Sequence, residues 1–241
     1  MKKKLIIVLI ILLALIAVLC GAFFIYAADY YHASETCGAA LSSDSSVTVK
    51  KTDTGYLFDG PSEDHALIFY PGAKVESTSY APLLHRLAAE GFDVFLVDMP
   101  FNLAIFGKNK ASDILNEYGS SYDQWYISGH SLGGAVASMY VAGDNGSAFE
   151  GIVFLASYPA SQVPDNMACL LITGSEDTVI NRKNLEDSRS LLPSSAVFHT
   201  IEGGNHARFG NYGEQKGDGK ASLTPSEQQE ETVRIIVEKF L

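Results

Sequence analysis

The sequence predicts an α/β fold: a doubly wound, mostly parallel sheet preceded by an N-terminal transmembrane helix. Three observations predict it. Short runs rich in Val, Ile, Leu and Phe recur along the chain, as is typical of strands buried on both faces. Amphipathic segments separate most of these runs, as expected for helices that cover a sheet. An uncharged apolar run of 24 residues, 5–28, comes first and can cross the roughly 30 Å hydrocarbon layer of a bilayer.

The N-terminal segment, residues 1–28, is predicted to be an uncleaved, single-pass anchor in the cell membrane. Lysines at positions 2–4 precede the apolar run and should stay in the cytoplasm, so the rest of the chain should lie outside. Cleavage near Ala28 is an alternative that would give a secreted protein, although signal peptides have shorter apolar cores of about 7–15 residues. Lipidation at Cys20 is a second alternative, weakened by Leu19 where a small residue is needed.

The charge of the part beyond the anchor excludes some classes of partner. The chain carries 17 basic and 28 acidic residues, and three of the basic ones are the lysines at positions 2–4. The remainder therefore holds 14 basic against 28 acidic residues, a formal charge of −14. Such a surface repels nucleic acid and anionic headgroups, so we expect no polyanionic partner. No obligate protein partner is implied either.

Residues 29–46 are small, polar and aperiodic, and are predicted to form a linker with little structure. Cys37 lies in this linker and Cys169 in a strand-like run. An oxidising compartment would permit a disulfide between them, but their settings do not favour one. The remainder, residues 47–241, is predicted to be a single domain, because its length suits one core and nothing marks a second.

The first half of this domain begins with a hairpin and continues as alternating strands and helices. The segments 46–51 and 55–60 are predicted to pair, and 66–70 is a buried strand that ends at Pro71-Gly72. The segment 79–91 places leucines on one face and ends in glycine, as helices commonly do. A strand at 92–98 and a helix at 111–119 follow.

The second half continues the same alternation. Predicted strands are 124–128, 151–157, 168–173 and 196–202, and predicted helices are 132–143, 181–192 and 225–241. Only about a dozen residues separate 151–157 from 168–173, which is too few for a helical cap domain. A site at the carboxyl ends of these strands should therefore be shallow and open.

The stretch Gly129-His130-Ser131-Leu132-Gly133 matches G-x-S-x-G between a predicted strand and a predicted helix. In that context the serine occupies a sharp, strained turn, and the glycines avoid collisions with the flanking elements. The turn exposes the hydroxyl of Ser131 above the edge of the sheet. Ser131 is therefore the candidate nucleophile, and the alternative is a serine that only caps the helix.

A serine hydroxyl needs a base, and the base needs an orienting acid. Of six histidines, His206 alone follows the last predicted strand in a glycine-rich loop at the edge where Ser131 lies. Asp177 follows the strand 168–173 and opens onto the same edge, which makes it the preferred acid. Glu176 and Asp98 are the alternatives: adjacent residues point apart, so only one of Asp177 and Glu176 can reach His206, and Asp98 follows an earlier strand.

The oxyanion of an acyl-transfer reaction needs two N–H donors. Leu132 follows the nucleophile and supplies one backbone N–H. The loop after the strand 66–70 should supply the other, by position from Ala73, while Gly72 allows a close approach.

With these residues the chain resembles the α/β-hydrolase superfamily from about Leu67 to Leu241. More narrowly, "YPGAKVESTSYAPL", "DMPFNLAIFG", "GHSLGG" and "IEGGNHARFGNYG" resemble a group of small, capless, dienelactone-hydrolase-like bacterial proteins. The resemblance implies an α/β-hydrolase fold with Ser131, Asp177 and His206 in the nucleophile, acid and base order of that fold. It implies hydrolysis of a small-molecule ester or thioester through an acyl-enzyme, without metal or organic cofactor. Dienelactone hydrolases use cysteine as nucleophile, so serine here puts the dienelactone substrate in doubt.

Two other functions stay open: acyl transfer by the same three residues, and a non-catalytic binding module that kept the fold. Candidate substrate-binding residues complete the set. Gly72 and Lys74 lie beside the expected oxyanion hole, and Phe101, with Leu103, Ile105 and Phe106, forms either an acyl pocket or core. Phe209 and Tyr212, in a long aperiodic loop, are predicted to fold over the site as a partial lid.

Overall fold

The structure, a computed structural model, describes residues 2–61 and 64–241, and the chain divides into two units between Tyr30 and Tyr31. The first unit is the helix α1, Lys2–Ala28, in which the apolar side chains are mostly exposed. Within the described residues it is the one helix long and apolar enough to cross a membrane, a test that an N-terminal signal sequence also passes.

The described part of the second unit, residues 31–61 and 64–241, contains an eight-stranded sheet in the order β1-β2-β4-β3-β5-β6-β7-β8. The strands β1 and β2 form an antiparallel hairpin, and β2 pairs antiparallel with β4, while the strands from β3 to β8 run parallel. The bounds are β1 Thr48–Lys51, β2 Gly55–Asp59, β3 His65–Tyr70, β4 Asp93–Val97, β5 Gln124–His130, β6 Gly151–Leu155, β7 Ala168–Gly174 and β8 Val197–Ile201. The predicted mostly parallel sheet is confirmed.

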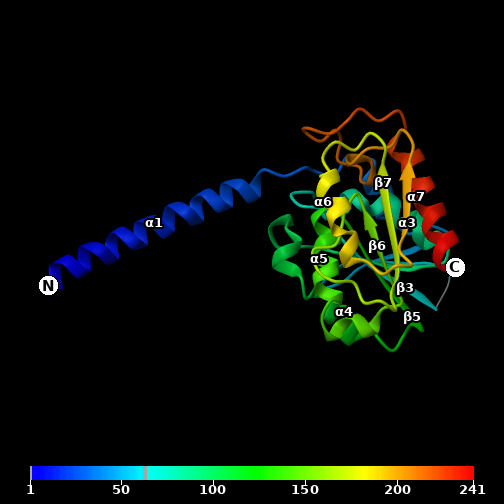
Figure 1. Ribbon diagram of the computed structural model, residues 1–241, viewed down its shortest axis with the longest axis horizontal. Helices are drawn as coiled ribbons and strands as arrows, with labels where there is room; N and C mark the ends of the chain where they lie inside the picture. Colours follow the sequence, from blue (N-terminus) through cyan, green and yellow to red (C-terminus); the bar gives the residue numbers. More distant parts are fainter. Residues whose placement is uncertain (1, 62–63) are drawn as a thin grey trace. The chain divides into compact units, whose positions relative to one another are not determined.

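Helices cover both faces of this sheet, which makes the fold doubly wound (Figure 1). The α-helices are α2 Cys37–Ala40, α3 Ala81–Ala89, α4 Lys110–Tyr118, α5 Leu132–Val141, α6 Arg182–Asp187 and α7 Pro225–Phe240. Short 3-10 helices are Ser77–Tyr80, Pro100–Asn102, Ala104–Gly107, Asp144–Ala148, Ser188–Leu191 and Ala207–Phe209. One face carries α3 and α7, and the other carries α4 and α5.

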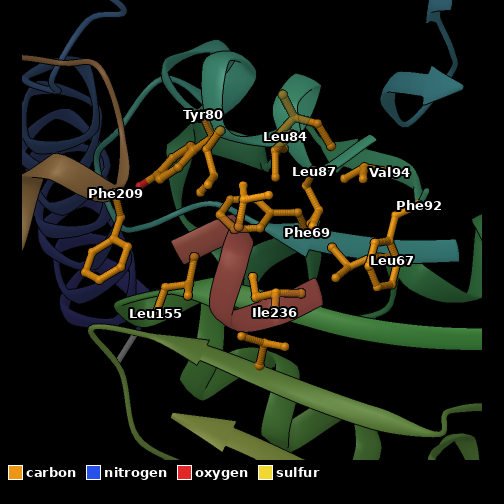
Figure 2. Packing of buried hydrophobic residues seen from close by; sticks show 14 of the residues in the cluster. Leu67, Phe69, Tyr80, Leu84, Leu87, Phe92, Val94, Leu155, Phe209 and Ile236 are labelled. Carbon is orange, nitrogen blue, oxygen red and sulfur yellow. The ribbon is translucent and has the colours of Figure 1, made fainter. Parts of the chain in front are cut away.

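Two apolar clusters, one on each face, hold the layers together. On the α3/α7 face, Leu84 and Leu87 of α3 and Ile236 of α7 pack on Leu67 and Phe69 of β3 (Figure 2). A cluster of the same kind joins α4 and α5 to the opposite face. Alternate residues of one strand enter the two clusters, which is why these strands are apolar at nearly every position.

Residues 31–46 differ from the predicted loose linker, because they pack on the domain. Tyr31 N–H donates to the carbonyl of Lys74 at 2.7 Å, and Ser34 N–H donates to the carbonyl of Asn211 at 2.8 Å. The side chain of Cys37 is buried, and both Cys37 and Cys169 are free thiols. Hydrogen bonds of this kind use the backbone, so a polar composition does not reveal them.

The described connection after β6 adds no helix over the carboxyl edge of the sheet. In the described chain, residues 156–167 contain no helix and lead directly into β7. The predicted absence of a cap domain is therefore confirmed.

Candidate active site

Ser131 lies in the sharp turn between β5 and α5, with a φ of 51° and a ψ of −121°. A positive φ is strained for a residue with a side chain, and it is typical of a nucleophile turn. The flanking glycines make the turn possible. A Cβ on Gly129 would lie 2.4 Å from the backbone of Gly133 and Gly134, and a Cβ on Gly133 would lie 2.1 Å from the carbonyl oxygen of Tyr70.

Neighbouring strands hold this turn in place. The N–H of Ser131 donates to the carbonyl of Leu155 at 2.9 Å, and its carbonyl accepts from the hydroxyl of Ser157 at 2.6 Å. Ala156, between these two residues, has a φ of 45°, which is also strained. Two strained residues therefore meet at the ends of β5 and β6, as is common at functional sites.

His206 and Asp177 form a buried pair at the same edge. His206 Nδ1 lies 2.9 Å from Asp177 Oδ2, and the two side chains are 2% and 0% exposed. A carboxylate only accepts hydrogen bonds, so Nδ1 carries the proton and donates it. In the neutral imidazole this tautomer leaves the other ring nitrogen, Nε2, free to act as a base.

The carboxylate of Asp177 is held from its other side. Its Oδ1 accepts the backbone N–H groups of Val179 and Ile180, each at 2.9 Å, which leaves Oδ2 for the histidine. The alternative acids lie elsewhere. Glu176 is exposed and bonds to a neighbouring serine, and Asp98 accepts hydrogen bonds from Lys51 and from a serine hydroxyl.

The loop that carries His206 is fixed by buried polar side chains. The amide of Gln228, on α7, accepts from the N–H of Asn205 and donates to its carbonyl, both at 2.9 Å. Asp218 Oδ2 accepts the N–H of Ala207 at 2.9 Å. These bonds clamp both neighbours of His206, and sequence reasoning missed them, since a buried glutamine on a helix resembles a surface one in sequence.

Ser131 and His206 line one cavity of about 270 Å³. The other lining residues are Leu132, Ala135, Ala156, Ser157, Tyr158, Val179, Ile180 and Asn181. Several of these follow β6 and β7. The rule that ligands bind outside the carboxyl ends of parallel strands would have pointed to them. Among the described residues, no group of three or more His, Cys, Asp or Glu side chains is arranged to hold a metal ion.

Of the two predicted oxyanion-hole residues, Leu132 lines the cavity and Ala73 does not. No acceptor in the described part of the chain takes the N–H of Ala73 or of Leu132. The glycine at 133 lets the start of α5 approach the end of β3, so the two N–H groups lie on neighbouring segments. Gly72 is needed here as well, because a Cβ on it would lie 2.7 Å from Nδ1 of His130.

The buried side chain of His130, the residue before Ser131, forms hydrogen bonds with two other segments of the site. Its Nδ1 lies 2.8 Å from the hydroxyl of Tyr80, which also accepts the N–H of Gly72 at 3.1 Å. Its Nε2 lies 3.0 Å from the carbonyl of His206 and must donate to it. Burial, with a smaller contribution from the nearby His206, holds the pKa of His130 well below its ordinary value. A neutral ring thus links the Gly72 loop to the backbone of His206.

Acidification from pH about 7.5 to about 5 is expected to destabilise the domain through His130. Below the ordinary histidine pKa of about 6.5, the unfolded chain takes up a proton that the buried ring does not bind. The unfolded state then binds more protons, so this residue lowers the free energy of unfolding by up to about 1.4 kcal/mol per pH unit as the pH falls. Urea unfolding across this range should show a flatter dependence in His130→Gln than in the control His32→Gln. Equal slopes in both would contradict the assignment.

None of the five predicted substrate-binding residues lines this cavity: Gly72, Lys74, Phe101, Phe209 and Tyr212 all lie outside its lining. Phe209 is fully buried in the α3/α7 cluster (Figure 2), and Tyr212 is a buried member of the same cluster. They therefore support the fold of their loop instead of covering the site as the predicted lid. The backbone N–H of Lys74 donates to the carbonyl of Asn102 at 2.7 Å, which joins its loop to the loop after β4. Phe101 is 45% exposed, so it does not belong to the hydrophobic core either, which was the alternative prediction for this residue.

Replacing Phe209 with alanine is expected to lower the free energy of unfolding by about 3–5 kcal/mol, as for a fully buried phenylalanine. Phe106→Ala is the matched control, because that ring is 54% exposed. The control should change stability by no more than about 0.5 kcal/mol. Chemical unfolding of both variants measures the difference, and a Phe209→Ala chain as stable as the control would place that ring outside the core.

Comparisons with known proteins agree with this geometry. The family model described as the alpha/beta hydrolase family matches residues 66–231. An esterase of Pyrobaculum calidifontis is similar with a TM-score of 0.62 and 17% identity, covering 84% of this chain and 87% of its own. A predicted CIB-like hydrolase from Thermoplasma acidophilum is similar with a TM-score of 0.59 and 17% identity, covering 80% and 97%.

The esterase 2 of Thermogutta terrifontis, phosphoramylated by tabun, has a TM-score of 0.55 and 13% identity, covering 80% of this chain and 95% of its own. At these identities the solved structures establish the fold alone. Comparison with the sequences of curated proteins gives no match. The narrower resemblance to dienelactone-hydrolase-like proteins stays a prediction. The family model spans most of the chain, and the chain therefore belongs to the alpha/beta hydrolase family of enzymes.

Proposed function

We propose that this enzyme is a serine hydrolase that cleaves carboxylic ester or thioester bonds through an acyl-enzyme. Ser131 is the nucleophile, His206 the base and Asp177 the residue that orients the base. One observation carries the proposal: His206 forms a buried 2.9 Å pair with Asp177 through Nδ1, and the same histidine lines one cavity with Ser131.

In the acylation step, Ser131 Oγ adds to the carbonyl carbon of the substrate while its proton passes to Nε2 of His206. The carbonyl oxygen becomes an oxyanion, and the N–H groups of Ala73 and Leu132 are the proposed donors to it. The bond to the leaving alcohol or thiol then breaks. The leaving group takes the proton from His206, and the acyl group stays on Ser131.

Deacylation repeats these steps with water as the nucleophile. Water gives a proton to His206 and attacks the acyl carbon, the bond to Ser131 Oγ breaks, and the serine recovers the proton. Asp177 keeps the imidazole in the productive tautomer and stabilises its charged form during both steps. An alcohol in place of water would give acyl transfer by the same residues.

The cavity supports small or extended esters as substrates. It measures about 270 Å³, and Leu132, Val179 and Ile180 give it apolar walls for an acyl or alkyl group. The short connection 156–167 adds no helix over it in the described chain. An open site of this kind restricts the length of a substrate less than an enclosed one does.

We propose that residues 1–28 anchor the enzyme in the cell membrane in a single pass, with the catalytic domain outside the cytoplasm. The length and composition of α1 and the lysines at positions 2–4 support this orientation. Residues 29–46 would then join the anchor to the domain that runs to Leu241, and most of this connection packs on the domain.

Reaction of the full chain with a fluorophosphonate probe tests the proposed function, since such probes modify activated serines. We expect labelling at Ser131, mapped by mass spectrometry of the modified peptide, and hydrolysis of nitrophenyl esters. A panel from acetyl to long acyl chains would give the preferred length. A folded chain that neither reacts with the probe nor cleaves any ester of the panel would favour the non-catalytic binding module.

A further inference from the structure

The loop that follows β4, residues 99–107, presents large apolar side chains to the surface. We call it the apolar loop. Phe101, Ile105 and Phe106 are 45%, 46% and 54% exposed, and the two phenylalanine rings meet edge to face at 5.8 Å. In residues 31–61 and 64–241, the other large apolar side chains of comparable exposure are Val179, Val197, Phe198 and Leu241, which lie apart from this loop in the sequence.

The backbone holds these side chains outward. Phe101 and Asn102 both have left-handed conformations, with φ of 58° and 53°. Such backbone is uncommon for phenylalanine and persists only where its surroundings fix it. Here the N–H of Asn102 donates to the carbonyl of Met99 at 3.0 Å, and its carbonyl accepts the N–H of Lys74 at 2.7 Å. The exposure of the loop is thus built into its structure.

Along the sequence, the apolar loop and the residues that follow it directly carry no acidic side chain. No aspartate or glutamate occurs between Asp98 and Asp113, although the chain carries 28 acidic residues. Lys108 and Lys110 follow the loop directly. Apolar side chains bordered by lysines are typical of surfaces that contact a membrane, because the rings enter the interface and the ammonium groups meet the phosphates.

The chain enters the domain at this same loop. Tyr31 N–H donates to the carbonyl of Lys74 at 2.7 Å, and the N–H of Lys74 donates to the carbonyl of Asn102. Tyr31 comes three residues after Ala28, the last residue of α1. Three residues reach at most about 11 Å, so the covalent chain passes from the last residue of α1 to Tyr31 within that length.

We propose that the apolar loop is the surface through which the domain contacts the bilayer that holds its own anchor. Phe101, Ile105 and Phe106 enter the interfacial layer of the outer leaflet, and Lys108 and Lys110 lie at the level of the phosphates. The occupant of this surface is lipid. The inference rests on the proposed anchor and not on the proposed catalytic residues.

Tryptophan fluorescence in proteoliposomes of the full chain tests this inference. The lipids are phosphatidylcholine, brominated on its acyl chains in half of the samples, with phosphatidylglycerol. Phe106→Trp and Ile105→Trp place reporters in the apolar loop, and neither replaces a buried side chain. Trp125, the one tryptophan of the chain, is buried and gives a constant background. Phe198→Trp, on β8 and 38% exposed, is the matched control.

We expect both loop reporters to emit at shorter wavelength than the control and to lose emission in brominated lipid, whereas Phe198→Trp keeps its emission. A third variant, Phe24→Trp, reports on the anchor. Quenching at position 24 without quenching at 105 or 106 would overturn the proposal. Absence of quenching at all positions would overturn it too, because the anchor is then not in the bilayer. The readout needs no turnover, so a chain that reacts with a fluorophosphonate but shows no loop quenching loses only this inference.

Discussion

Replacing Ser131 with alanine is expected to lower kcat for nitrophenyl ester hydrolysis by at least about 10⁴-fold, because the acyl-enzyme can no longer form. The backbone of the turn should survive, since the N–H of Ser131 keeps its bond to Leu155 and the carbonyl keeps its bond to Ser157. Steady-state kinetics and fluorophosphonate labelling of the same preparations measure the loss. Labelling should disappear together with turnover.

Ser194→Ala is the matched control for this variant, because it removes an exposed serine hydroxyl far along the chain from the turn. It should hydrolyse the ester and react with the probe as the unmodified chain does. Full turnover or persistent labelling in Ser131→Ala would refute the nucleophile, whereas loss in both variants would indicate a general defect in folding.

Asp177→Asn is expected to lower kcat by about 10⁴-fold with little effect on the fold, through the tautomer of His206. The side-chain oxygen of the asparagine would keep the N–H groups of Val179 and Ile180, which now bond to Oδ1 of Asp177. Its NH₂ group would then face Nδ1 of His206 and oblige that nitrogen to accept. The proton moves to Nε2, which can no longer take the proton of Ser131.

Glu176→Gln makes the same chemical change on the adjacent residue and serves as the control. Glu176 is exposed and its carboxylate bonds to the hydroxyl of Ser175, so its loss should leave kcat within about two-fold of the unmodified chain. The reverse pattern would make Glu176 the orienting acid.

Much of the fold follows from local patterns in the sequence. Strands such as β3 and β6 are apolar at nearly every position because both faces are covered, and α3 repeats its leucines at the spacing of one helical face. The motif around Ser131 could also be recognised from the sequence. Its glycines are needed because any side chain there would collide with backbone close to the turn. The length of the apolar run in α1 is likewise enough to predict a helix that can span a membrane.

Other features depended on contacts between residues far apart in the chain. Asp177 and Glu176 are neighbours of the same chemistry, and only the turn that fixes one carboxylate on two N–H groups brings it to His206. The brace formed by His130 and Tyr80 is invisible in the sequence for the same reason. Phe209 is predicted as a lid residue because an aperiodic loop carries no signal of which side chains it buries.

The sequence by itself therefore determined the order of strands and helices, the turn that exposes Ser131 and the apolar N-terminal helix. Only the tertiary structure decided which carboxylate meets His206, that residues 31–46 pack on the domain, and that the loop after β4 faces outward. The physical reason is the distance along the chain over which each kind of interaction acts. Periodicity and turn chemistry act over a few residues, whereas hydrogen bonds and burial at this site join segments separated by tens of residues.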